Sequence, residues 1–124
     1  MPDLPVVLVV EDEEPLQLVI HKTLKDGGFD VLAVASAEEA LALLQSGVVK
    51  YSALVTDIAL KDGVNGWDVA RQARDIDPSL AVVYATGASA DDWRAQGVPN
   101  SILLEKPFAM TELLTAVSHF LTPG

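Results

Sequence analysis

Short apolar runs alternate with longer amphipathic patterns along most of the chain. Between the runs, apolar residues recur every three or four positions, which is typical of helices with one buried face. The runs have the length and the β-branched content of buried strands and cover Val6–Val10 and residues 29–34, 53–55, 80–85 and 102–104. The helical patterns cover residues 16–24, 37–44, 67–76 and 110–121, with a short, weakly periodic one at 91–96.

Residues that start or stop helices support these boundaries. Gly27 and Gly28 follow the first helical pattern, and glycine commonly ends a helix. Ser36 and Glu39 have the spacing of a capping box at the start of the second. Pro78 closes the third pattern, because the residue before a proline avoids helical geometry.

The resulting order is a strand followed by a helix, five times over. Strands that are apolar on both faces belong to a parallel sheet that is covered by helices on each side. A length of 124 residues with no repeat or linker predicts one α/β domain over residues 1–124, with its core at about 5–122.

Composition narrows the classes of function. Eight Lys and Arg against eighteen Asp and Glu give a net charge of −10, which argues against direct binding to nucleic acid. The absence of Cys excludes disulfides and thiolate chemistry. No signal-peptide pattern or membrane-length apolar stretch is present, so the sequence predicts a cytoplasmic protein without a membrane anchor.

Polar side chains follow four of the five predicted strands. In parallel α/β sheets, ligands bind at the carboxyl ends of the strands, so these side chains should share one edge. They are Glu11 and Asp12 after the first strand, Asp57 after the third, Thr86 after the fourth and Lys106 after the fifth.

Converging carboxylates repel one another unless a cation lies between them. Glu11, Asp12 and Asp57 offer hard oxygen ligands, and the backbone carbonyl of Ala59 could add a neutral one. No His or Cys is close in sequence to these residues, which disfavours zinc. The sequence therefore predicts a Mg²⁺ site.

The same group of residues suits phosphoryl chemistry. An Asp carboxylate can attack phosphorus and form an acyl phosphate, and Asp57 is the candidate nucleophile. The Lys106 ammonium and the Thr86 hydroxyl are suited to phosphoryl oxygens. A metal would reduce the repulsion between the carboxylate and the incoming anion.

These motifs, in this order, resemble the receiver domain of two-component response regulators, in its single-domain, chemotaxis-regulator-like form. The resemblance runs from Val6 to about Leu121. The segments that carry it are VLVVEDEE at 7–14, VTDIAL at 55–60, NGWDVA at 65–70, ATGAS at 85–89 and EKPF at 105–108.

The resemblance implies a flavodoxin-like fold with strand order 2-1-3-4-5 and a Mg²⁺ cofactor, for which Mn²⁺ can substitute. It implies phosphotransfer to Asp57 from a sensor histidine kinase or a histidine phosphotransfer protein, followed by control of a downstream effector or output domain. In that family pattern Thr86 is the switch hydroxyl, Lys106 contacts the phosphoryl group, and the Lys106–Pro107 bond is cis. The protein would be a bacterial phosphoprotein, either a monomer or a phosphorylation-dependent dimer, and not an enzyme with a separate substrate.

Four features depart from the family pattern. The acidic pair Glu11–Asp12 is Glu-Asp instead of Asp-Asp, and the loop LKDGVNG at 60–66 lacks the usual Met-Pro and reaches its glycine one residue late. Leu103 stands where the family has a switch aromatic, so the usual route of the signal is in question. The chain ends at Gly124, which leaves open a stand-alone receiver or one separated from an output domain.

Two other functions compete with this prediction. A receiver that works largely unphosphorylated, as an adaptor or dimerisation module, is favoured by Leu103 and opposed by the complete set of acids, Thr86 and Lys106. An aspartyl-phosphate phosphatase of the haloacid-dehalogenase type needs a second Asp two residues after the nucleophile, and here that position is Ala59.

Overall fold

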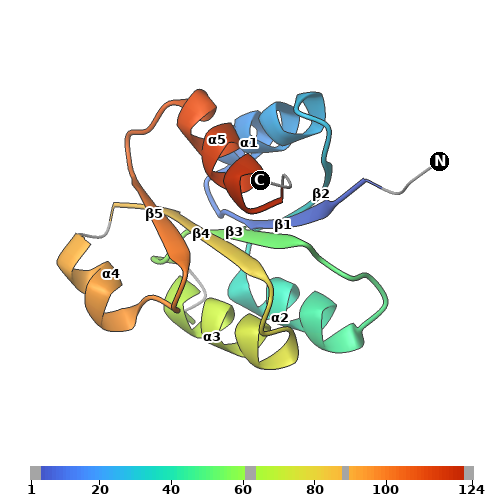
Figure 1. Ribbon diagram of the computed structural model, residues 1–124, viewed down its shortest axis with the longest axis vertical. Coiled ribbons are helices and arrows are strands. Elements are labelled where there is room, and N and C mark those ends of the chain that lie inside the picture. The colour runs from blue at the N-terminus through green and yellow to red at the C-terminus, as the bar shows by residue number, and fades with distance from the viewer. Residues whose placement is uncertain (1–3, 61–63, 88–89, 122–124) are drawn as a thin grey trace.

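Strands and helices alternate along the whole chain (Figure 1), as the apolar periodicity predicts. The computed structural model describes residues 4–60, 64–87 and 90–121. The elements are β1 (Val6–Val10), α1 (Glu14–Asp26), β2 (Asp30–Val34), α2 (Ala37–Ser46), β3 (Ala53–Thr56), α3 (Gly66–Ile76), β4 (Ala81–Thr86), α4 (Ala90–Gln96), β5 (Ser101–Glu105) and α5 (Met110–Leu121). The weakly periodic segment does form a helix, α4.

The five strands form one parallel sheet with the order β2-β1-β3-β4-β5. Helices α1 and α5 cover one face, and α2 and α3 cover the other (Figure 1). This is the flavodoxin-like α/β fold that the resemblance implies, and the prediction is confirmed. No helix in the described part of the chain has the length and apolar character to span a membrane.

The core consists of two apolar layers, one on each face of the sheet. Alternate residues of a strand point to opposite faces, so Val7 and Val9 pack on the side of α1 and α5 while Leu8 and Val10 pack on the side of α2 and α3. All four side chains are at most 1% exposed. A strand that is buried on both faces holds its end residues rigidly, and β1 ends next to Glu11.

Two of the helices begin with a side-chain cap. At α2, the Ser36 Oγ accepts the backbone N–H of Glu39 at 3.1 Å, in agreement with the predicted capping box. At α3, the side chain of Asn65 accepts the N–H of Asp68 at 3.0 Å. The cap by Asn65 fixes where α3 starts, immediately after the loop that follows Asp57.

Helix α4 is attached to the rest of the fold by the half-buried Trp93, which packs on the apolar layer beneath α2 and α3, and by polar contacts. None of its seven residues is buried. The indole N–H of Trp93 donates to Ser101 Oγ at 2.9 Å, and Arg71 on α3 donates to the Gln96 carbonyl at 3.0 Å. Arg74 donates to the Pro99 carbonyl at 2.6 Å. The side chains of α3 and α4 therefore hold the α4–β5 connection in place.

Candidate functional site

The ends of β1 and β3 bring the predicted acidic residues together. Val10 pairs with Thr56 in the sheet, so Glu11 and Asp57 leave the two strands side by side. The sheet hydrogen bonds continue one residue further, because Asp57 N–H donates to the Val10 carbonyl at 3.0 Å. The position of both carboxylates follows from the register of two buried strands.

Glu11, Asp12 and Asp57 form a compact acidic cluster. A carboxylate oxygen from each lies within 4.8 Å of the others. Glu11 is 2% exposed and Asp57 is 8% exposed, whereas Asp12 is half-buried. Carboxylates that are this buried and this close repel one another unless positive charge lies nearby.

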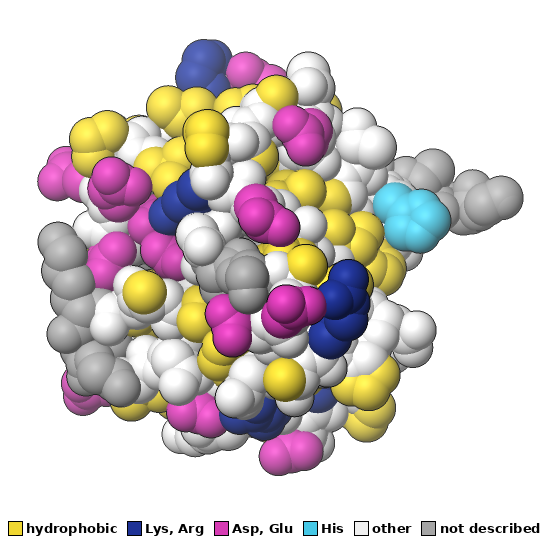
Figure 2. Space-filling view, turned by 90° about the vertical axis from the view of Figure 1, so that its left-hand side faces the viewer, with side chains coloured by type: hydrophobic (Ala, Val, Ile, Leu, Met, Phe, Trp, Pro, Cys, Tyr) yellow, Lys and Arg dark blue, Asp and Glu magenta, His cyan; other side chains and the backbone are white. Residues whose placement is uncertain are grey.

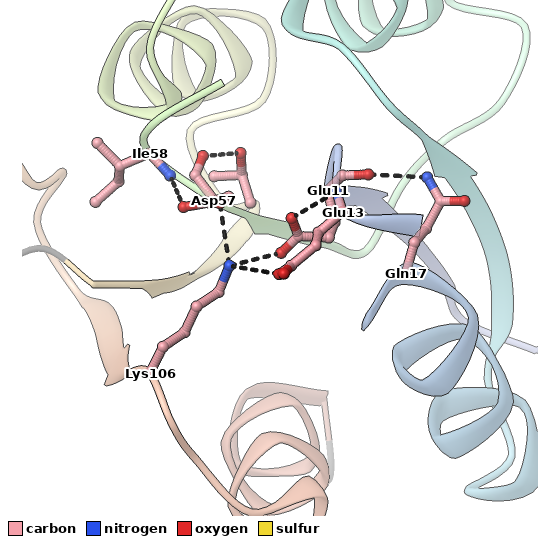
Figure 3. Close-up of polar contacts among 7 residues, drawn as sticks. Glu11, Glu13, Gln17, Asp57, Ile58 and Lys106 are labelled. Atoms are coloured by element: carbon pink, nitrogen blue, oxygen red, sulfur yellow. Dashed lines mark hydrogen bonds and ion pairs between the residues drawn. The ribbon is translucent and has the colours of Figure 1, made fainter. Parts of the chain in front are cut away.

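Lys106 supplies one such charge from the end of β5 (Figure 3). Its ammonium donates to Glu11 Oε1 at 3.0 Å and to Asp57 Oδ2 at 3.1 Å. Its backbone N–H donates to the Thr86 carbonyl at 2.8 Å, which fixes the base of the side chain. The Lys106–Pro107 peptide bond is cis, as the resemblance implies. Lys106 thus joins two acids that lie 46 positions apart in the sequence.

The charges in this cluster shift one another's protonation. Burial raises the pKa of Glu11, and the hydrogen bonds from Lys106 and from the Glu13 N–H only partly oppose that rise. Burial would lower the pKa of Lys106, but its hydrogen bonds to Glu11 and Asp57 outweigh it, so the pKa is raised. Lys106 therefore stays protonated at neutral pH.

The second oxygen of Asp57 is held by the backbone that follows it. Asp57 Oδ1 accepts the N–H of Ile58 at 2.7 Å, and the Ile58 carbonyl accepts the N–H of Gly66 at 2.8 Å. A Cβ placed on Gly66 would lie 2.0 Å from the backbone oxygen of Asp57. Only glycine allows the start of α3 to approach the Asp57 backbone this closely.

Thr86 and Ala59 lie where the sequence places them, but their roles stay predictions. Thr86 ends β4, is 2% exposed, and is joined to Lys106 through its carbonyl. Ala59 is exposed, two residues after Asp57. The loop residues 61–63, in which the sequence departs from the family pattern, lie outside the described residues.

Leu103, at the position expected for a switch aromatic, lies opposite Tyr84 in the sheet. It is half-buried and packs on the apolar layer beneath α2 and α3. Tyr84 is fully buried, its ring meets Trp67 edge to face at 4.7 Å, and its hydroxyl accepts the N–H of Val98 at 3.1 Å. The aromatic side chain that contacts the α4–β5 connection is therefore Tyr84 of β4, whereas position 103 of β5 carries a leucine.

Sequence reasoning missed two residues beside the acidic cluster. The Glu13 carboxylate lies 4.0 Å from the Lys106 ammonium, and Gln17 donates its amide N–H to the Glu11 carbonyl at 3.0 Å (Figure 3). Glu13 belongs to an acidic run at the start of α1, where acids are common because they interact favourably with the positive end of the helix dipole. Gln17 lies one turn into α1, six residues after Glu11, and this spacing matches no helical or turn pattern that would have indicated the contact.

The donor set fits a hard divalent cation. All three clustered ligand groups are carboxylates, and Lys106 offsets one of their three charges. A cation such as Mg²⁺ prefers oxygen ligands and would compensate the remaining negative charge. The chemistry of the donors, and the burial of two of them, agree with the predicted metal.

The fold and the acidic cluster at its strand ends define a class of signalling domain, which comparison with known proteins identifies. Residues 7–118 match the family model of the response regulator receiver domain. The chain therefore belongs to the response regulator receiver family, whose domains are signalling modules of two-component systems and not classical enzymes.

Relatives of nearly the same length support this assignment. The chain is 28% identical to the response regulator receiver protein CpdR of Brucella abortus, over 93% of this chain and 95% of that protein. It is 45% identical to a response regulator receiver protein of Sinorhizobium medicae, whose crystal structure superposes with a TM-score of 0.91 and covers 95% of this chain and 94% of that one. The chain also matches part of a much longer protein, the C4-dicarboxylate transport transcriptional regulator DctD of Rhizobium meliloti, at 30% identity over 89% of this chain and 24% of that protein.

Replacing Glu11 with Gln should change how stability depends on pH. Because the folded state raises the pKa of Glu11, the stability contributed by its protonated form is present below about pH 4.5 and lost as pH rises through the folded pKa. Glu11→Gln should remove this loss, so the variant gains stability relative to the wild type toward neutral pH. Urea midpoints measured across this range in a chelating buffer test the effect.

The exposed Glu14, on the first turn of α1, provides the matched control. Glu14→Gln should leave the shape of the pH profile unchanged. A Glu11→Gln variant whose stability falls toward neutral pH as steeply as that of the wild type would contradict the prediction.

Proposed function

We propose that this protein accepts a phosphoryl group on Asp57, from the phospho-His of a sensor histidine kinase or a histidine phosphotransfer protein. The observation that carries the proposal is the cluster of Glu11, Asp12 and Asp57 with the Lys106 ammonium bonded to two of them. Receiver family membership supports it. The functional unit would comprise residues 1–124, with a core at about 5–122, acting in the cytoplasm.

The residues present can carry out this transfer. An Asp57 carboxylate oxygen attacks phosphorus, the P–O bond forms, the P–N bond to the donor imidazole breaks, and the imidazole keeps the electron pair. Ile58 N–H holds Oδ1, so the side chain has a fixed orientation before attack. Lys106 already contacts Oδ2 and can move to the phosphoryl oxygens as they arrive. Thr86 offers a hydroxyl to the same group.

Glu11, Asp12 and Asp57 would hold Mg²⁺ or Mn²⁺, with the Ala59 carbonyl as a further ligand. When bound, the ion would offset the repulsion between the acids and an incoming phosphoryl anion. The acidic cluster would bind the ion through carboxylate oxygens, and the Lys106 ammonium, no longer needed to offset the acids, could turn to the phosphoryl group.

The added charge would then bias the elements around the site toward a state that a partner recognises. The partner is a downstream effector or an output domain. Figure 2 looks onto the side of α4 and β5 and shows many acidic side chains with apolar ones between them. Such a face suits a protein partner better than nucleic acid, in agreement with the net charge of −10.

Incubation with a small acyl phosphate donor tests the proposal. Intact mass spectrometry should show a single added phosphoryl group when Mg²⁺ or Mn²⁺ is present and none in chelator. The modification should be labile to hydroxylamine, as an acyl phosphate is. Failure to incorporate phosphate under any metal condition would overturn the proposal. Phosphorylation that changes neither molecular size nor partner affinity would favour the adaptor function instead.

Removing the Lys106 charge should destabilise the metal-free protein. Lys106→Met keeps the apolar stem but leaves Glu11 and Asp57 facing each other without a cation. Because Lys106 is 25% exposed, the expected cost is about 2 kcal/mol, below the range for fully buried pairs. Mg²⁺ should reduce the difference, since it replaces the missing charge. Urea unfolding with and without Mg²⁺ measures both effects.

Lys22→Met is the control, because Lys22 is 79% exposed in a surface ion pair with Asp26. It should change stability by no more than about 0.5 kcal/mol. If Lys106→Met unfolds at the wild-type midpoint in chelator, Lys106 does not neutralise the cluster.

A further inference from the structure

Glu13 is a third carboxylate within reach of the Lys106 ammonium. Its Oε2 lies 4.0 Å from Lys106 Nζ, compared with 3.0 Å for Glu11 Oε1 and 3.1 Å for Asp57 Oδ2. Figure 3 shows the Glu11 and Glu13 carboxylates on the same side of the ammonium. The Glu13 side chain is 65% exposed, whereas that of Glu11 is 2% exposed. Lys106 therefore lies between two buried acids and one acid at the surface.

The side chain of Glu13 does not serve the helix that it precedes. Glu13 takes the N-cap position of α1, but its carboxylate makes no capping hydrogen bond. Its backbone N–H donates to Glu11 Oε2 at 3.1 Å, which fixes the residue beside the acidic cluster. Among the described residues, the Glu13 carboxylate forms an ion pair with Lys106 and with no other cation. Its charge therefore acts mainly on Lys106.

Lys106 has room to move between these acids. Its side chain lines a hollow of about 470 Å³ together with Glu13, Leu16 and Phe108. The side chain is 25% exposed, while the backbone N–H is held by the Thr86 carbonyl. A lysine stem is flexible, so the ammonium can exchange one carboxylate for another while the strand ends stay in place.

Glu13 differs from the two closer acids in what a divalent cation would do to it. Glu11 and Asp57 belong to the group of three carboxylates that would hold the ion, and Glu13 lies outside that group. The ion would compensate the two acids that now hold Lys106 most closely, whereas Glu13 would keep its full charge. Glu13 and an incoming phosphoryl group would then compete for the same ammonium, because both are anions.

We propose that Glu13 is a positioning residue that draws the Lys106 ammonium away from a phosphoryl group on Asp57 and so limits how strongly the site holds that group. This role rests on the proposed acceptance of a phosphoryl group by Asp57. The Glu13 charge also lowers the positive potential around Lys106, which acts in the same direction. Because the Glu13 side chain is 65% exposed, the expected effect on affinity is about two- to fivefold, as for other surface ion pairs.

Beryllofluoride, a stable mimic of the phosphoryl group, tests the proposal through binding alone. Isothermal titration calorimetry of the full chain in saturating Mg²⁺ measures its affinity. Glu13→Gln should bind beryllofluoride about two- to fivefold more tightly than the wild type, and the difference should shrink as salt is raised. A gain in affinity cannot arise from a misfolded variant.

Two further variants separate the contact with Lys106 from charge alone. Glu14→Gln removes the same charge from the next residue, which forms no ion pair with Lys106. It should leave the affinity for beryllofluoride close to that of the wild type. Glu13→Asp keeps the charge, but an Asp at the N-cap turns its carboxylate to the first turn of α1. It should therefore bind the mimic nearly as tightly as Glu13→Gln.

The possible failures of this experiment are distinct. Equal affinities of the wild type and Glu13→Gln would overturn the role of Glu13 and leave the proposed function intact. A gain that Glu14→Gln reproduces, or that Glu13→Asp lacks, would also overturn it, because charge alone would then explain the gain. A wild type that binds no beryllofluoride in Mg²⁺ and takes up no phosphate would overturn the proposed function, and the role of Glu13 with it.

Discussion

Asp57→Asn should abolish phosphorylation while the protein stays folded. The amide is a poor nucleophile and cannot form a stable acyl phosphate, so the rate should fall by at least about a hundredfold. Asn keeps an oxygen for the Ile58 N–H, which now bonds Asp57 Oδ1 at 2.7 Å. The loss of one of three clustered carboxylates also reduces repulsion, so stability in chelator should not decrease.

Intact mass spectrometry after incubation with the acyl phosphate donor and Mg²⁺ measures the effect. Asp91→Asn is a matched control, because its side chain is 90% exposed on α4 and pairs only with Arg94 among the contacts described. It should be phosphorylated like the wild type. Undiminished phosphate incorporation by Asp57→Asn would place the acceptor on another residue.

Gly66→Ala should cost both stability and phosphorylation rate. The added Cβ would lie 2.0 Å from the Asp57 carbonyl oxygen and 2.9 Å from Ile58 Cα, and both are backbone atoms that cannot rotate away. The start of α3 or the strand end must shift, at a cost of about 3 kcal/mol or more. The shift would also disturb the hydrogen bond that orients the Asp57 carboxylate.

Urea unfolding and the initial rate of phosphate incorporation measure these two losses. Gly87→Ala is the control for stability, because a Cβ there meets nothing within 4 Å. Its midpoint should stay close to that of the wild type. A Gly66→Ala variant as stable as Gly87→Ala would show that the contact relaxes without cost.

The acidic cluster could be predicted from the sequence because its geometry follows from regular structure. Apolar runs locate the strands, parallel strands end at one edge, and so Glu11 and Asp57 had to lie close together. Lys106 was predicted on the same basis. The structure shows which carboxylate oxygens Lys106 contacts. The sequence could not show this, because a flexible side chain can reach several acids from one strand end.

Contacts that depend on loop geometry could not be predicted. The Tyr84 hydroxyl bonds Val98 in the connection before β5, in which Asn100 has a φ of 59°, a left-handed conformation that periodicity does not reveal. The close approach of Gly66 to Asp57 depends equally on how a loop folds back. The spacing of that glycine marked the loop as unusual without showing what the glycine touches.

The sparse attachment of α4 has a consequence for its motion in the native state. Helix α4 has no buried residue, and only the half-buried Trp93 packs its apolar surface on the core, so little apolar area is exposed when the helix opens. Its polar contacts are equally few: the Trp93 indole bonds Ser101, and Arg71 bonds the Gln96 carbonyl. Its amides should exchange with solvent deuterium through local opening, well before those of β1 and β3. The free energy needed to displace α4 is therefore only a small part of the free energy that holds the sheet together.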